Sequence, residues 1–128
     1  MSKINFDSTS FGNVVVNGKR YLCDIFVFAD GRIEKRDRRI AMFGSHAFTL
    51  DETRPLVEDA KILVVGTGQF GIRITSGRKH YGSAALTPRA RKLCRTKRVQ
   101  VIEMKTPLAL QKFNEVKGKK AAMIHVAC

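Results

Sequence analysis

Lys61-Ile-Leu-Val-Val-Gly-Thr-Gly-Gln-Phe-Gly71 is the stretch that decides the fold. Its apolar run shows no polar alternation, which is typical of a strand buried on both faces in the middle of a parallel sheet. Three glycines with the spacing G-x-G-x-x-G end the run, and glycines there let the backbone turn sharply and let a ligand approach. We therefore expect a central strand whose carboxyl end marks a site.

The residues after this stretch alternate between helical and extended patterns. Thr87-Pro88 and Thr106-Pro107 each have the order of an N-cap and a first helical residue, so each predicts a helix start. Residues 99–104 predict a second central strand, and residues 119–126 predict a last strand. An order of strand, helix, strand, helix, strand implies right-handed crossovers and parallel pairing.

The residues before it predict antiparallel strands. Asn17-Gly18 and Asp30-Gly31 each lie between short strand-like runs, which is a strong hairpin signal. Residues 13–37 therefore predict a meander of three or four strands. The charged run 32–36 is predicted to be either an edge strand that its charges protect from aggregation or, together with Arg38 and Arg39, a basic binding strip.

The remaining local patterns predict one helix and two loops. Thr49-x-x-Glu52 matches a capping box and predicts a helix over residues 50–59, with Pro55 causing an irregular turn or a restart. Residues 8–13 and 76–83 predict loops.

These elements together predict an α/β fold class. The fold is layered, with a central, mostly parallel sheet and helices, plus an N-terminal antiparallel β-meander. We expect a single domain over residues 1–128, with the meander at 13–37 and the α/β part at 60–128. No apolar run approaches the ~20 residues of a membrane helix, and no signal peptide is apparent. Three scattered cysteines indicate reduced thiols and a cytoplasmic location.

The formal charge of +13 is unevenly distributed. Residues 1–59 hold nine acidic and nine basic residues, whereas residues 60–102 hold ten basic residues and no acidic one. Such a field attracts nucleic acid, anionic lipid or an acidic partner. A solvated helix face that keeps the protein in solution is the alternative. The basic surface is predicted on the helix after Thr87, at Arg89, Arg91, Lys92 and Arg95.

The glycine spacing equals that of a dinucleotide fingerprint, but its context differs. No helix start follows Gly71, and the nearest later acid, Glu103, lies well beyond the ~20 residues expected for a ribose-binding acid. A tight turn is one alternative, and a nest for a small anion at the end of the strand is the other. The candidate anion or ligand site consists of Gly66, Thr67, Gly68, Gln69, Gly71, Arg73, Arg78 and Lys79.

The sequence predicts no catalytic residue, no metal site and no cofactor. The three histidines lack ligand spacing, and His125 and Cys128, three apart on a strand, face opposite sides. Cys94 and Cys23 are expected to pack in the interior. No acid lies between Asp59 and Glu103 to activate a base near the glycine loop.

Four short patterns follow one another along the chain. They are Ser10-Phe11-Gly12, Val16-Asn17-Gly18, Gly66-Thr67-Gly68, and a closing segment with Glu103-Met104, Thr106, Ala109 and Phe113-Asn114. Over about residues 4–128, the chain resembles the small, uncharacterised Mth938-like domain family. Its relatives include a mitochondrial respiratory complex I assembly factor and an adipogenesis-associated protein, which has a similar His-x-x-Cys ending. The chain departs from the family at Lys97-Arg98, where relatives usually have glycine and isoleucine.

The resemblance implies an α/β fold, a compact single domain and no established enzyme activity, and by analogy it makes a protein-binding role credible. Our first hypothesis is a non-enzymatic binding or assembly protein. It would contact a protein partner or a second copy of itself through the Gly66–Gly71 loop and the basic surface. The second is a small-anion-binding protein or enzyme that uses the Gly66–Gly71 loop. The third is a protein that binds nucleic acid non-specifically, with an affinity that falls with salt.

Overall fold

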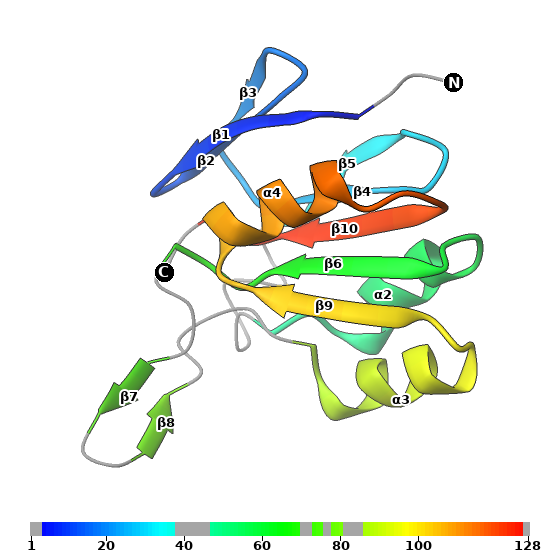
Figure 1. The fold of residues 1–128 in the computed structure, drawn as a ribbon. Coiled ribbons are helices and arrows are strands. Elements are labelled where there is room, and N and C mark those ends of the chain that lie inside the picture. Colours follow the sequence, from blue (N-terminus) through cyan, green and yellow to red (C-terminus); the bar gives the residue numbers. More distant parts are fainter. Residues whose placement is uncertain (1–3, 38–46, 70–72, 76–77, 81–85, 127–128) are drawn as a thin grey trace.

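The computed structural model describes residues 4–37, 47–69, 73–75, 78–80 and 86–126, with the backbone alone for 73–75 and 78–80. Within these residues the strands form three sheets, of five, three and two strands, accompanied by three helices (Figure 1). The predicted α/β fold class is confirmed. The predictions for Arg38, Arg39 and Gly71 concern positions outside the described residues.

The five-stranded sheet has the order β5-β4-β10-β6-β9. Its strands are β4 (Ile25–Val27), β5 (Ile33–Lys35), β6 (Ile62–Gly66), β9 (Gln100–Met104) and β10 (Lys120–Ile124). β6 pairs in parallel with both β9 and β10, and β10 pairs antiparallel with β4. The stretch that begins at Lys61 therefore supplies a central parallel strand, as predicted.

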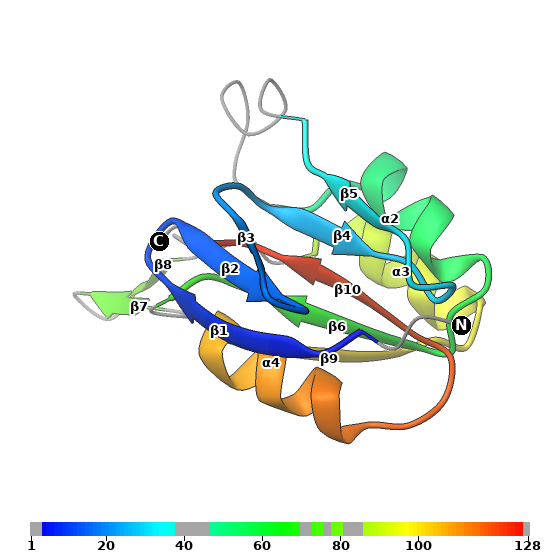
Figure 2. The same ribbon diagram turned by 90° about the horizontal axis from the view of Figure 1, so that it is seen from above.

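Both faces of this sheet are covered. The helices are α2 (Leu50–Val57), α3 (Pro88–Thr96) and α4 (Thr106–Glu115). Leu63 and Val65 of β6 pack toward α2 and α3, whereas Val64 packs toward α4 and the N-terminal strands. Figure 2 shows α4 on one side of the sheet and the two other helices on the opposite side. Burial on both faces explains why the strand carries no polar alternation.

The three-stranded sheet joins β1 (Phe6–Ser10), β2 (Asn13–Val16) and β3 (Lys19–Tyr21) in that order. Asn17 and Gly18 have φ of 49° and 80°, the positive values that a tight hairpin turn requires. The loop predicted for residues 8–13 is wrong over Ser8–Ser10, which belong to β1.

The predicted meander is divided between two sheets. Its first hairpin, β2–β3, belongs to the three-stranded sheet, and its second hairpin, β4–β5, belongs to the five-stranded sheet. The division arises because β4 pairs with β10. β5 is an edge strand, as predicted, but Arg36 just after it is buried.

Two strand predictions need correction. Residues 99–104 were expected to form a central strand, yet β9 pairs only with β6 among the described residues and lies at the edge of the sheet. Residues 78–80, predicted as loop, form β8 (Arg78–His80), which pairs antiparallel with β7 (Arg73–Thr75). In Figure 1 this hairpin projects away from the body of the molecule.

The helix ends follow the sequence signals in two of three cases. Thr49 and Glu52 form the predicted capping box, and α2 continues through Pro55 without interruption. Thr87 caps α3 through its side chain. The cap predicted at Thr106 is wrong, because Lys105 is the N-cap of α4 and makes no side-chain cap bond.

The turn after α3 contains Arg98 at φ 58°. A non-glycine residue rarely adopts this left-handed conformation. This is where the sequence departs from the family it resembles.

Phe113 of α4 is 1% exposed and lies edge-on to Phe6 of β1, with ring centroids 5.0 Å apart. We expect Phe113→Ala to lower the free energy of unfolding by about 3–5 kcal/mol, because it opens a cavity between α4 and β1. Urea unfolding measures this loss. Leu108→Ala on the same helix, where the side chain is 44% exposed, is the control and should change stability by less than about 0.5 kcal/mol. Equal losses in both variants would contradict the assigned packing.

Candidate functional site

The carboxyl ends of β6, β9 and β10 meet at Thr106. Its hydroxyl donates to the carbonyl oxygen of His125 at 2.6 Å and accepts from the N–H of Gly68 at 3.0 Å. A Cβ on Gly66 would lie 2.9 Å from this hydroxyl oxygen and 3.4 Å from the Cα of Thr106. The first glycine of the motif is therefore required for close packing against the start of α4.

The glycine loop is held by internal hydrogen bonds. The N–H of Thr67 donates to the carbonyl of Met104 at 2.9 Å, and the N–H of Gly68 donates to Thr106. Gln69 donates through Nε2 to Thr9 Oγ1 at 3.0 Å. The N–H groups of Thr67 and Gly68 are thus already engaged and do not serve an anion in this arrangement.

The rest of the predicted anion site stays a prediction. Arg73 lies in β7, and Arg78 and Lys79 lie in β8, on the projecting hairpin whose backbone alone is described. Gly71 is outside the described residues. The structure therefore places Gly66, Thr67, Gly68 and Gln69 at the carboxyl end of the parallel strands. It records no contact between them and the side chains of Arg73, Arg78 and Lys79.

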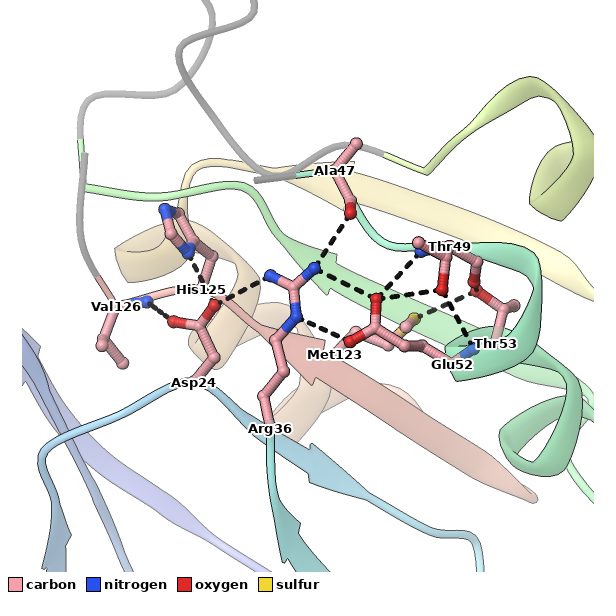
Figure 3. Close-up of polar contacts among 9 residues, drawn as sticks. All are labelled: Asp24, Arg36, Ala47, Thr49, Glu52, Thr53, Met123, His125 and Val126. Carbon is pink, nitrogen blue, oxygen red and sulfur yellow. Dashed lines mark hydrogen bonds and ion pairs between the residues drawn. The ribbon is translucent and has the colours of Figure 1, made fainter. Parts of the chain in front are cut away.

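A buried ionic cluster lies beside this carboxyl end of the sheet (Figure 3). It consists of Asp24, Arg36, Glu52 and His125, which are 9%, 4%, 9% and 3% exposed. Arg36 donates through Nε to Glu52 Oε2 at 2.7 Å and through Nη1 to Asp24 Oδ2 at 3.1 Å. Its Nη2 donates to the carbonyl of Ala47 at 2.9 Å and to Glu52 Oε1 at 3.0 Å. The guanidinium also lies over the Phe48 ring, 4.5 Å from its centroid.

Asp24 links this cluster to the end of β10. Its Oδ2 lies 2.8 Å from Nδ1 of His125, and its Oδ1 accepts from the N–H of Val126 at 2.9 Å. Burial raises the pKa of Asp24, but the hydrogen bond and charge of His125, the Val126 N–H and Arg36 outweigh burial and hold this pKa below its usual value. Asp24 is therefore a carboxylate at neutral pH, and it orients the His125 ring.

No sequence pattern indicated this cluster, because its members come from four distant segments. Glu52 was recognised only as a capping residue, a role that it keeps by accepting from Thr49 N at 3.0 Å. The sequence indicates His125 only as a possible metal ligand, with the other histidines or with Cys128, which is outside the described residues. The stretch between Asp59 and Glu103 supplies no acid near the glycine loop, but Asp24 reaches His125 from the N-terminal part of the chain.

The four residues predicted to form a basic surface lie on α3, and three of them are exposed. Arg89, Lys92 and Arg95 are exposed. Arg91 is half-buried and forms an ion pair with Glu103 of β9, with Nη2 to Oε2 at 2.8 Å. Glu103 also accepts from the N–H of Leu86 at 3.3 Å. Arg91 therefore attaches α3 to the edge strand and adds little free charge to the surface.

Two further predictions concern the packing of the cysteines and the presence of a metal site. Cys94 is buried in the core as expected, and burial, then Glu103, raise the pKa of its thiol despite the charge of Arg91. Cys23 is half-buried beside the core under the N-terminal sheet. Across the described part of the chain, no three His, Cys, Asp or Glu residues are grouped so that they could hold a metal ion.

Searches against family models and against curated proteins give no match. Among solved structures, the chain is similar to the conserved hypothetical protein PH1505 of Pyrococcus horikoshii OT3. The two are 35% identical with a TM-score of 0.77, over 97% of this chain and 99% of that chain. A second similar structure is MT938, with 27% identity and a TM-score of 0.62 over 98% and 100% of the two chains.

A third similar structure is a protein of Bordetella pertussis, solved in solution by NMR and described as a Mth938-like domain. It has a TM-score of 0.65 over 96% of this chain and 85% of that chain. Its sequence identity is 15%, so this likeness concerns the fold alone.

The ionic cluster makes Arg36 critical for stability. We expect Arg36→Met to lower the free energy of unfolding by about 3–5 kcal/mol, because it leaves two buried carboxylates without their cation. The matched control is Arg32→Met, because Arg32 pairs with Glu34 on the surface; it should cost about 0–1 kcal/mol. Urea unfolding measures both values. The double variant R36M/E52Q should recover part of the loss, and no recovery would argue against unpaired charge as the cause.

Asp24 should also contribute to acid sensitivity. Its pKa is lowered in the folded state, so its stabilising contribution is present above the ordinary Asp pKa and is lost as the pH falls through the folded pKa. Asp24→Asn should therefore flatten the decline of unfolding free energy below about pH 4. Urea unfolding at a series of pH values tests this, with Asp59→Asn, at an exposed carboxylate, as the control. An unchanged decline in D24N would refute it.

Proposed function

The chain belongs to the Mth938-like domain family, and on this premise we propose that it is a non-enzymatic binding or assembly protein whose contact surface is the basic face of α3. The partner is an acidic macromolecule, of which an acidic protein surface is our first candidate.

The observation that carries this proposal is the set of unpaired cations on α3. Arg89, Lys92 and Arg95 are exposed on the helix, and Lys97 and Arg98 continue the surface beyond its end. None of the five forms an ion pair with another part of the described chain. Positive charge that is not neutralised within the molecule remains available to attract an anionic partner.

Burial, capping and an ion pair fix α3 against the sheet. Ala90 and Cys94 are buried against the sheet, Thr87 caps the first turn, and the ion pair of Arg91 with Glu103 attaches the helix to β9. A surface on a rigid element loses less conformational freedom on binding than a loop does. This supports α3 as a contact surface and not only as a solvated helix face.

The anion-binding or enzymatic alternative has weaker support. The Asp24–His125 pair lies at the carboxyl ends of the parallel strands, where α/β proteins place ligand sites. However, both side chains are buried, and the N–H groups of Thr67 and Gly68 are engaged.

Within the described residues, no helix is long and apolar enough to cross a bilayer.

The test compares the triple variant R89S/K92S/R95S with K105S/K117S/K119S, which removes the same charge from exposed lysines outside α3. Fluorescence anisotropy follows binding to labelled poly-L-glutamate and to labelled duplex DNA at low salt. We expect the α3 variant to bind poly-L-glutamate about tenfold more weakly, since each exposed charge contributes about 0.5 kcal/mol, and the control to bind like the wild type.

Equal losses in the two variants would mean that net charge alone drives the binding, and they would overturn the proposal. Tighter binding of DNA than of poly-L-glutamate, lost in the α3 variant and steeply dependent on salt, would favour the nucleic-acid function instead.

A further inference from the structure

A groove of about 440 Å³ lies between β3 and the end of β5. Residues 19–23 line one side and Lys35 and Arg36 line the other. β3 belongs to the sheet that packs on the α4 side, and Figure 1 shows β3 and α3 on opposite sides of the molecule. The groove is therefore a surface separate from the one in the proposed function.

Both strands beside the groove are edges of their sheets. β3 pairs only with β2 and β5 only with β4 within the described residues. In a hairpin with a two-residue turn, Val16 and Lys19 form the hydrogen-bonded pair nearest the turn. Arg20 then occupies the next, non-hydrogen-bonded pair, and its backbone N–H and C=O point away from β2. β3 thus presents backbone groups that another strand can bind.

The lining of the groove is cationic with an apolar part. Lys19, Arg20 and Lys35 are exposed and form no ion pair with a described residue. Leu22, which is 73% exposed, adds an apolar side chain to this lining. No carboxylate is among the residues that line the groove. Asp24, next to Cys23, turns inward to Arg36 and His125, and Glu34, next to Lys35, pairs with Arg32.

We propose that this groove binds an extended, acidic segment of a partner protein as an added strand along β3. The main chain of the segment pairs with the outward N–H and C=O of Arg20, as in other cases of strand addition. Its carboxylates contact Lys19, Arg20 and Lys35, and its apolar side chains cover Leu22. The same lysines and arginine repel a second copy of this edge, which explains selectivity for an acidic strand over self-pairing.

The lining favours a peptide over single-stranded nucleic acid. Nucleic acid binding without sequence preference relies on several aromatic faces for base stacking. Tyr21 is the aromatic residue of this lining. Its ring packs partly against the core and lies 5.2 Å from the Lys19 ammonium, measured to the ring centroid. The exposed backbone edge, by contrast, offers both an N–H and a C=O. A peptide backbone pairs with both groups, whereas a phosphate oxygen only accepts from the N–H.

The test uses a short, fluorescein-labelled synthetic peptide that alternates Glu and Val, with fluorescence anisotropy as the readout. R20E/K35E should weaken binding about tenfold or more, because both substitutions reverse a charge that contacts the acidic peptide. Both positions are exposed, so we expect the variant to fold. N-methylation of alternate peptide amides should weaken it about fivefold, the equivalent of one lost hydrogen bond. In the α3 variant R89S/K92S/R95S the peptide should still protect the Arg20 amide from exchange, so failure of this proposal is distinguishable from failure of the proposed function.

Hydrogen exchange of the full chain, followed by NMR, locates the peptide. Protection of the Arg20 amide on binding supports strand addition on β3. Binding that leaves this amide unprotected, equal affinity for a Lys–Val peptide, or tighter binding of oligo-dT than of the acidic peptide would each overturn the proposal.

Discussion

The fold depends on the need to neutralise one buried cation. Arg36 follows β5, and its guanidinium finds its partners in the segment before β4, in α2 and in the backbone at Ala47. Through Asp24, the same network reaches His125 and Val126 after β10. A buried charge is tolerated only when its partners are in place, so these elements must be positioned together. The cluster therefore fixes how α2 and the β4–β5 hairpin dock on the end of the central sheet.

Local sequence signals predicted individual helices, strands and turns well. The order of strands in the sheet depends on long-range pairing and was predicted less well. The Asn17-Gly18 turn, the Thr49–Glu52 box and the apolar run of β6 depend on nearby residues, and each appears in the structure as expected. The position of β9 at an edge depends on which strands compete for β6, and no local pattern records this. Thr106 shows the same limit, since its hydroxyl serves the glycine loop and β10 and does not cap its own helix.

The candidate sites show a similar division. The cationic face of α3 could be predicted because helical spacing separates Ala90 and Cys94 from Arg89, Lys92 and Arg95, but only the structure reveals that Glu103 neutralises Arg91. The ionic cluster could not be predicted, because Asp24 and His125 lie 101 positions apart in the sequence. In the glycine loop, the G-x-G spacing reflects steric and hydrogen-bonding demands of α4 at Gly66 and Gly68. Glycine spacing by itself therefore does not establish a phosphate-binding loop.

The position of β10 has a consequence for how the chain folds during synthesis. β10 follows every other described strand in the sequence, yet it lies between β4 and β6 in the sheet. Until it leaves the ribosome, the β4–β5 hairpin and the β6–β9 pair have no common neighbour, and their facing edges remain open. The five-stranded sheet is therefore completed late, through contacts between distant residues, which slows folding and exposes unpaired edges for a time. The edges left open are those of β4 and β6, two apolar strands, so the nascent chain is prone to edge-to-edge association until β10 covers both.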